Sequence, residues 1–161
     1  MAVRPVLRYP NRALKEVCRA LADGEEPGDA AADLLDTMSA HPGCVGLAAP
    51  QIGAMVRIVA VDVSEHPKAE SSNGRLVLVN PVVVREDGAD VAREGCLSIP
   101  HLTANVRRAT TIEVEARGTR FESSGFEARC VLHEIDHLDG LLFLDRVDSL
   151  STDVFRRKNY R

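Results

Sequence analysis

The first regular pattern in the chain is a helical one. Four apolar residues recur at intervals of three and four after the polar loop 24–29: Ala31, Leu34, Leu35 and Met38. This spacing gathers them on one face of a helix. Pro42 and Gly43 follow, and both residue types interrupt helices. The pattern therefore predicts an amphipathic helix that begins after residue 29 and is stopped by Pro42 and Gly43.

Strand-like segments follow this helix. Three of them are rich in β-branched residues: 56–63, 75–84 and 110–118. The third alternates apolar and polar residues, which is typical of a strand with one buried face. The polar loop 64–74 separates the first two and has the composition of a surface turn. We therefore expect strands in the middle of the chain.

A second helix is predicted near the end of the chain. Ser123 or Ser124 can cap its start, and Gly140 stands where a left-handed residue ends a helix. Its apolar residues are Phe126, Val131, Leu132, Ile135 and Leu138. The order is then a helix, several strands and a long helix, without regular strand–helix alternation. This order favours an α+β fold over a doubly wound α/β fold.

Length and composition narrow the functional classes. No repeat or domain boundary is visible, so we expect one domain over residues 1–161. Hydrophobic residues make up 45% and charged residues 27%, as in globular proteins. Twenty Lys and Arg stand against 24 Asp and Glu, and this net charge of -4 argues against a general nucleic-acid binder. With no Trp, four Phe and two Tyr, stacking platforms for nucleic acid are not expected either.

The chain lacks the patterns of membrane insertion and export. Charged residues interrupt its N-terminal segment: Arg4, Arg8, Arg12 and Lys15. The longest apolar run, 76–84, is broken by Asn80 and Pro81 and is too short to span a bilayer. We expect a cytoplasmic protein with no membrane partner. Its four cysteines are widely spaced, so they are expected to be free thiols, and a special one would be a metal ligand or a nucleophile.

The sequence HEIDH at 133–137 carries the clearest chemistry. His133 and His137 lie one turn apart on the predicted helix, so that both imidazoles can bind one metal ion. Glu134 lies beside them and can handle the proton of a bound water. The alternative is a helix that contains these three residues by chance. The helical context favours the metal site.

A catalytic metal site needs a third protein ligand and an open position. The pattern H-E-x-x-H-x-x-G extends to Gly140, but Phe143 stands where metzincin peptidases place a third histidine, which weakens the peptidase interpretation. Cys96, in EGCLSIP at 94–100 and just after an expected strand, is the better candidate. The alternative for Cys96 is a small buried hydrophobic residue, the common fate of a free cysteine.

Three segments together resemble the signature motifs of peptide deformylases: GLAAPQIG at 46–53, EGCLSIP at 94–100 and HEIDHLDG at 133–140. Segments 5–17 and 141–147 are also similar to that family, so the resemblance covers nearly the whole chain. It implies hydrolysis of the formyl group of N-formylmethionine on nascent polypeptides, with release of formate. It also implies antiparallel sheets packed around a long central helix that carries HExxH.

The resemblance also implies roles for particular residues. The metal ligands that it implies are Cys96, His133 and His137. Glu134 matches the general acid and base, and Glu94 and Arg108 match a buried ion pair beside the site. Ligand chemistry alone suggests zinc. The resemblance implies one ferrous ion, Fe²⁺, with Zn²⁺ or Ni²⁺ as replacements in purified protein.

Four further residues are placed around the substrate by the resemblance. Gln51 and the backbone N–H of Leu97 match hydrogen-bond donors to the developing oxyanion. Val45 and Gly46 match the edge strand along which the peptide lies. The basic end of the chain, 156–161, carries four positive charges and suggests either a solvated terminus or a contact with the ribosome.

The chain departs from the family pattern in four places. Cys44 stands where the first motif would have its first glycine, and its side chain points either toward the substrate or into the core. Leu132 replaces a glutamine that often precedes the first histidine. Thr103 falls where some members have a substrate-contacting arginine, and the segment from Cys96 to His133 is several residues shorter than expected. None of these departures removes a ligand or Glu134.

Two other functions stay open beside deformylation of nascent peptides. The departures allow a deformylase-like paralogue that acts on another formylated or acylated compound. A catalytically silent metal-binding module is the second. The presence of Glu134 argues against this module, because a structural metal site needs only ligands and usually has a fourth protein ligand in place of an open position.

Overall fold

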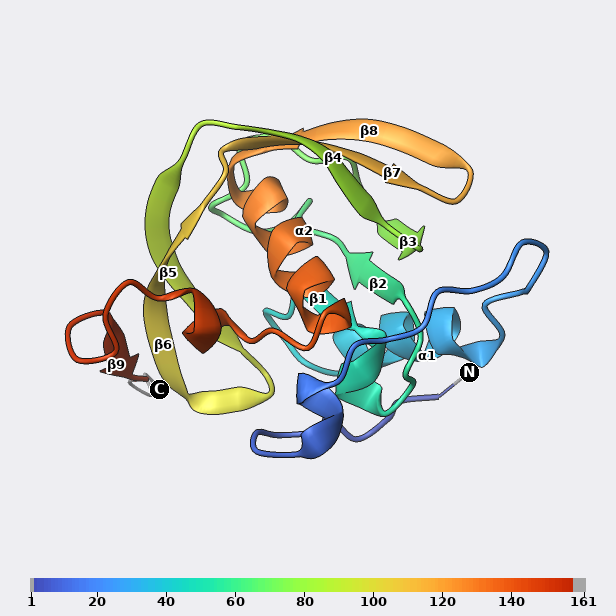
Figure 1. Cartoon of the computed structure of the whole chain (residues 1–161), viewed down its shortest axis with the longest axis horizontal. Helices are drawn as coiled ribbons and strands as arrows, with labels where there is room; N and C mark the ends of the chain where they lie inside the picture. Colours follow the sequence, from blue (N-terminus) through green and yellow to red (C-terminus); the bar gives the residue numbers. More distant parts are fainter. Residues whose placement is uncertain (1, 158–161) are drawn as a thin grey trace.

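Antiparallel sheets surround one helix in the computed structural model, which describes residues 2–157 (Figure 1). The helices are η1 (Arg12–Lys15), α1 (Asp29–Ser39), η2 (Ala49–Ile52), α2 (Gly125–Leu138) and η3 (Phe143–Arg146). The strands are β1 (Gly46–Ala48), β2 (Ile58–Val61), β3 (Leu76–Val79), β4 (Val82–Asp87), β5 (Asp90–Cys96), β6 (Ile99–Arg108), β7 (Thr111–Ala116), β8 (Thr119–Ser124) and β9 (Val154–Arg156). They form the sheets β1-β2-β3, β4-β7-β8 and β5-β6-β9. The predicted α+β class is confirmed.

The helix α2 passes through the middle of the molecule, between the sheets (Figure 1). Every residue from Glu127 to Leu138 is buried, so even its polar side chains face protein. Ser124 is the N-cap residue, while the Ser123 hydroxyl donates to Glu127 Oε1 at 2.7 Å. The helix ends before Gly140, which has the predicted left-handed conformation with φ 74°. From Glu127 onward, α2 can therefore place polar and ionisable side chains in the interior.

The sheet β1-β2-β3 packs against both α1 and α2. Its edge strand β1 pairs with β2 in the register Gly46↔Val61. Asp62 N–H donates to Val45 O at 2.8 Å, so Val45 and Asp62 form a hydrogen-bonded pair. Because such pairs alternate along an antiparallel ladder, the next pair, Gly46 and Val61, is not hydrogen-bonded. The N–H and C=O groups of Gly46 consequently point away from β2, toward the open edge of the sheet.

The predicted strand 75–84 is wrong in one respect, because it is two strands in different sheets. β3 ends at Val79 and β4 begins at Val82, and they pair with β2 and β7 respectively. Asn80 interrupts the strand with φ 52°, and its side-chain amide bonds both the N–H and the C=O of Leu21. Pro81 has no N–H to donate. The other two predicted strands are present with shorter bounds, and both predicted helices are present.

Of the hairpin of β5 and β6, the sequence predicted only a strand next to Cys96, without bounds. Its sequence has charged residues at many positions, and only Glu94 and Cys96 of β5 are buried. Cys96 is the last residue of β5. β9 adds to the other edge of β6 and brings Arg156 and then Arg157 beside the hairpin. The remaining residues of the basic segment 156–161 lie outside the described residues. No helix among the described residues is both long and apolar enough to cross a membrane.

Candidate metal centre

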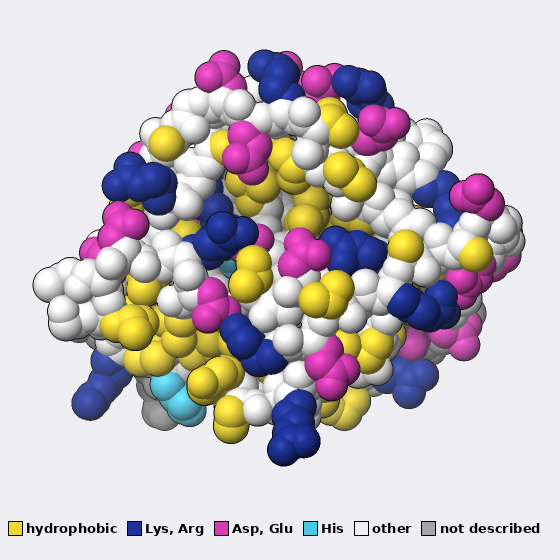
Figure 2. Space-filling view, viewed as in Figure 1, with side chains coloured by type: hydrophobic (Ala, Val, Ile, Leu, Met, Phe, Trp, Pro, Cys, Tyr) yellow, Lys and Arg dark blue, Asp and Glu magenta, His cyan; other side chains and the backbone are white. Residues whose placement is uncertain are grey.

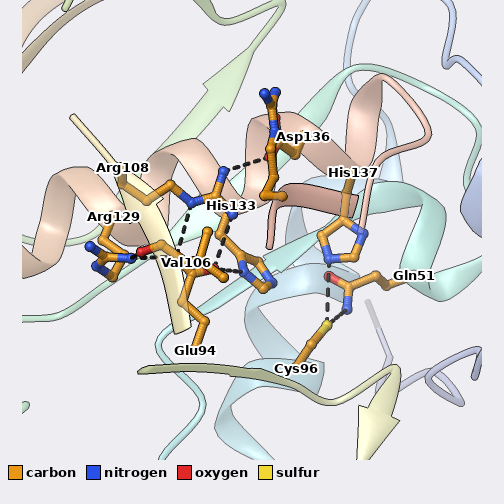
Figure 3. Close-up of polar contacts among 10 residues, drawn as sticks. Gln51, Glu94, Cys96, Val106, Arg108, Arg129, His133, Asp136 and His137 are labelled. Carbon is orange, nitrogen blue, oxygen red and sulfur yellow. Dashed lines mark hydrogen bonds and ion pairs between the residues drawn. The ribbon is translucent and has the colours of Figure 1, made fainter. Parts of the chain in front are cut away.

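The three ligands implied by the sequence lie together in the structure. Cys96 comes from the end of β5, and His133 and His137 come from successive turns of α2 (Figure 3). Their ligand atoms all lie within 4.8 Å of one another, and Cys96 Sγ is 3.5 Å from His137 Nε2. All three side chains are buried. One thiol and two imidazoles at this spacing suit a transition-metal ion with one open position.

Glu94 fixes the orientation of His133. Its Oε1 atom lies 2.8 Å from His133 Nδ1, which leaves Nε2 of the ring for the centre. Arg108 binds the same carboxylate through two nitrogens, at 2.9 and 3.0 Å, and Arg129 binds it at 2.8 Å. Although burial opposes ionisation, the bonds from His133 and Arg108 hold the pKa of Glu94 well below its usual value. The ring therefore meets an ionised carboxylate.

A second carboxylate extends this network away from the centre. Asp136 Oδ2 accepts a bond of 2.5 Å from Arg108 (Figure 3). Arg146 binds both oxygens of the same carboxylate. Arg108 thereby joins Glu94 on β5 to Asp136 on α2. Because these groups are buried, removing one would leave a charge without its partner, which is costly. The network ties the helix to the hairpin that carries Cys96.

Glu134 lies at the centre without a full set of partners. Its side chain is buried, and Oε1 has no hydrogen-bond partner among the described residues. Burial raises the pKa of Glu134 to about 7. A Cβ atom at position 46 would lie 2.7 Å from Glu134 Oε2, so only glycine leaves room for this carboxylate beside β1. The oxygen without a partner is free to accept a proton.

His137 is held in the neutral form that a metal ion needs. Burial, together with the nearby charges of His133 and Arg108, lowers its pKa well below the usual value. Its Nδ1 atom has no hydrogen-bond partner in the described part of the chain. Burial also opposes a positive charge on His133, but Glu134, Cys96 and Glu94 together raise its pKa. The same negative surroundings favour a metal cation at this point.

Gln51 touches the centre from η2. Its amide nitrogen donates to Cys96 Sγ at 3.3 Å and to Ser98 Oγ at 3.0 Å, and its Oε1 accepts from Ala48 N–H at 2.9 Å. Leu97, between β5 and β6, lies next in the chain to Cys96 and lines the same cleft. Of the two predicted oxyanion donors, Gln51 contacts the Cys96 sulfur directly, and Leu97 follows Cys96 in the chain.

The centre lies at the base of a cleft of about 390 Å³. Val45 and Gly46 line it, as do two of the positions that depart from the family pattern, Cys44 and Thr103. The Cys44 thiol donates to Gly46 O at 3.3 Å, and burial raises its pKa to about 12. Cys44 also packs against the apolar cluster around Leu47, so both expectations for its side chain hold in part.

The third departure, Leu132, lies elsewhere. It lines a separate cavity of about 380 Å³ between β4 and α2, together with Ile135 and Val82. Figure 2 shows this face of the molecule, where hydrophobic side chains are visible in a hollow bordered by charged ones. Leu132 therefore does not touch the cleft that holds the candidate centre.

Sequence reasoning missed several contributors to the site. Arg129 and Asp136 were not singled out, although each is a charged residue next to apolar positions of the predicted helix. A charge at such a position is the signal that could have found them, because buried charges need partners. Nothing in the pattern of residues indicated that Gly46 makes room for Glu134 or that Arg157 reaches the cleft.

The arrangement is a buried three-ligand centre beside a carboxylate, which is a class of site suited to metal-assisted hydrolysis. The family model of polypeptide deformylase matches residues 3–153. Peptide deformylases of Alkalilimnicola ehrlichii and Pseudoalteromonas translucida are 40% and 39% identical over 98% of this chain and over 89% and 95% of their own lengths. The chain belongs to the polypeptide deformylase family.

Solved structures agree with this assignment. The peptide deformylase of Thermotoga maritima matches with a TM-score of 0.79 and 30% identity, covering 92% of this chain and 100% of its own. That of Thermus thermophilus matches with a TM-score of 0.79 and 38% identity, covering 90% and 86%. The family consists of enzymes that remove the N-formyl group from nascent peptides, and it implies a metal ion.

Proposed function

We propose that this chain acts as a single catalytic domain, a metal-dependent hydrolase that removes the formyl group from the N-terminal formylmethionine of new polypeptides and releases formate. The position of Glu134 carries the proposal. Its buried carboxylate lies beside the three candidate ligands and keeps one oxygen without a partner among the described residues. A purely structural metal site has no use for such a group.

Cys96, His133 and His137 would hold one ion, Fe²⁺ in the cell, with Zn²⁺ or Ni²⁺ as replacements in purified protein. When bound, such an ion acts as a Lewis acid on the formyl oxygen and lowers the pKa of a water at its open position. Glu94 supports this function by keeping the ring of His133 in one orientation.

Glu134 moves the proton in this mechanism. Its free Oε1 takes a proton from the attacking water and returns it to the amine nitrogen as the bond between that nitrogen and the formyl carbon breaks. The Leu97 N–H and the Gln51 amide donate to the formyl oxygen as negative charge develops there. Gln51 must exchange its bond with Ser98 Oγ to do so, because both of its N–H groups are engaged.

The open edge of β1 supports binding of a peptide rather than a small amide. The N–H and C=O of Gly46 point away from β2 toward the cleft, where an extended peptide can add as a further strand. Val45 precedes this point and lines the same wall. The formylated end of such a peptide would then lie over Glu134, which occupies the space beside Gly46.

One observation favours a second candidate, a paralogue with a different formylated or acylated substrate. The Cys44 thiol already donates to the Gly46 carbonyl, which is one of the groups that the peptide would use. A substrate that does not need this carbonyl would be unaffected by Cys44.

Formate release by anaerobically prepared protein of known metal content tests the proposal. The substrates are formyl-Met-Ala-Ser, acetyl-Met-Ala-Ser and a simple formamide without a peptide. We expect rapid formate release from the first and little reaction of the other two. Preferred cleavage of either of the others would support the paralogue, and metal-loaded protein that cleaves none of the three would contradict hydrolysis altogether.

A further inference from the structure

The mouth of the cleft carries positive charges that no carboxylate of the described residues neutralises. Lys68, Arg93 and Arg157 all line the cleft and are exposed. Within residues 2–157, no carboxylate lies within ion-pair distance of any of the three. The carboxylates of the cleft, Glu94 and Glu134, are buried at its base instead, and Glu94 is already bound by two arginines.

Arg157 is brought to this position by the end of the chain. Its backbone N–H donates to His101 O at 2.8 Å, which continues the pairing of β9 with β6 past Arg156. Its guanidinium lies directly over Gly95, where a Cβ atom would collide with it. Gly95, which directly precedes Cys96 in the chain, therefore provides the space in which the Arg157 side chain enters the cleft.

Arg93 is held on the same face of the sheet. Its guanidinium stacks on the Phe155 ring at 3.8 Å and donates to Thr103 Oγ1 at 3.3 Å and Asn105 Oδ1 at 3.1 Å. These neutral partners fix the position of the group without cancelling its charge. Lys68 comes from the loop between β2 and β3. Cations from three separate segments therefore converge on one cleft.

We propose that Arg157, supported by Arg93 and Lys68, binds an acidic side chain of the substrate peptide two or three residues beyond the formylated methionine. The inference rests on the proposed function and names a sequence preference for it. Because Gly95 adjoins Cys96 and an extended chain advances about 3.3 Å per residue, these substrate positions come within reach of Arg157. Arg157 is then a specificity-determining residue.

A peptide fits these observations better than ribosomal RNA does. The cations line the walls of a cleft of about 390 Å³ that also contains Glu134 and Gly46. One extended chain can enter such a cleft, whereas a folded RNA would meet the outer surface of the molecule. A bound carboxylate would also supply the counter-charge that the described residues do not.

The test compares amidated peptides formyl-Met-Ala-Xaa-Ala and formyl-Met-Ala-Ala-Xaa, with Xaa as Asp, Asn or Lys, at low and high salt. For the metal-loaded wild-type protein we expect kcat/KM to be about three- to fivefold higher for Asp than for Asn, the size of a partly exposed ion pair. The ratio should approach one at high salt because such a pair is screened. A ratio near one at low salt for both peptide series would overturn the proposal.

Substitutions assign the effect to Arg157. Arg157→Ala should bring the Asp:Asn ratio close to one, and Arg157→Glu should reverse the preference toward Lys. Arg156→Ala is the matched control, because Arg156 is an exposed neighbour that does not line the cleft, and it should keep the wild-type ratio. Thr103→Arg added to Arg157→Ala should restore the preference, because position 103 lines the same part of the cleft.

The outcomes separate this inference from the proposed function. If the wild-type protein releases no formate from any of these peptides, the proposed function fails. If it releases formate but the Asp:Asn ratio is the same in the wild type and in Arg157→Ala, the inference alone fails. Loss of ribosome co-sedimentation in Arg157→Ala with an unchanged ratio would overturn it in favour of an RNA contact.

Discussion

Glu94 Oε1 lies 2.8 Å from His133 Nδ1, so a residue of the β5–β6 hairpin sets the orientation of a ring on the central helix. Glu94 is itself held by Arg108, which also binds Asp136 on α2. The hairpin and the helix are thereby fixed to each other at the point where Cys96 meets the two histidines. Metal affinity should depend on residues that never touch the ion.

Glu94→Gln should weaken metal binding about 10- to 100-fold, the usual cost of losing the partner of a ligating histidine. The amide keeps the size of the side chain but loses the charge that Arg108 and Arg129 require. Competition with a chelator of known affinity measures the change. Glu70→Gln, at an exposed position, is the control. Equal affinity in the two variants would contradict a role for Glu94.

Glu134→Ala should separate metal binding from catalysis. We expect the variant to retain its metal and to lose roughly 10²–10⁴-fold in kcat, as for the loss of a general base. Cys96→Ser, His133→Ala and His137→Ala should instead lose metal and activity together. Metal analysis and formate release on the same preparations give the answer, and near-normal turnover by Glu134→Ala would exclude the proposed mechanism.

Gln51→Ala tests the donor to the formyl oxygen. We expect a loss of roughly 10²–10³-fold in kcat with metal retained, the usual effect of removing one oxyanion donor. Ser98→Ala is an informative companion, because it frees the Gln51 N–H that now donates to Ser98 Oγ. It should not reproduce the loss. An unchanged kcat in Gln51→Ala would remove this residue from the reaction.

Local sequence patterns were sufficient for the parts of the fold that are strongly periodic. The apolar faces of α1 and α2 and the alternation in β7 appear at the predicted places. The bounds and pairing of the β5–β6 hairpin were not predicted, because β5 is largely exposed, β6 does not alternate regularly between buried and exposed positions, and the pairing depends on long-range contacts. Asn80 and Pro81 gave a visible signal for the break between β3 and β4.

The candidate site was accessible from sequence only where residue type and spacing carry chemistry. His133, Glu134 and His137 share one helix, so their spacing alone brings them together. Cys96 comes from another element, so the residues alone made it a candidate ligand with a buried hydrophobic residue as the alternative, and the resemblance connected it to the two histidines. The space beside Gly46 and the entry of Arg157 over Gly95 depend on how separate elements pack, and no local pattern encodes them.

Gly140→Ala should destabilise the fold more than Gly118→Ala does. Both glycines have left-handed backbones, with φ 74° and 73°, which cost a side-chain-bearing residue about 1–2 kcal/mol. A Cβ at Gly118 meets open space, whereas one at Gly140 would lie 2.5 Å from Lys15 O. We expect a further loss of about 1–3 kcal/mol at Gly140 from this overlap. Denaturant unfolding of the two variants measures the difference, and equal losses would contradict the close approach.

Cys44→Ala should raise the efficiency toward formylmethionyl peptides. The Cys44 thiol donates to Gly46 O, and burial raises its pKa to about 12, so the donor stays protonated at neutral pH. Removing it frees a carbonyl at the open edge of β1 for the peptide. We expect a gain of about fivefold in kcat/KM, or ~1 kcal/mol, with metal content unchanged. Cys44→Gly should give a similar gain, and Cys44→Ser, which keeps a donor, should stay near the wild type. If the alanine and glycine variants show no gain while retaining their metal, the thiol does not compete with the substrate and Cys44 serves the apolar cluster around Leu47 alone.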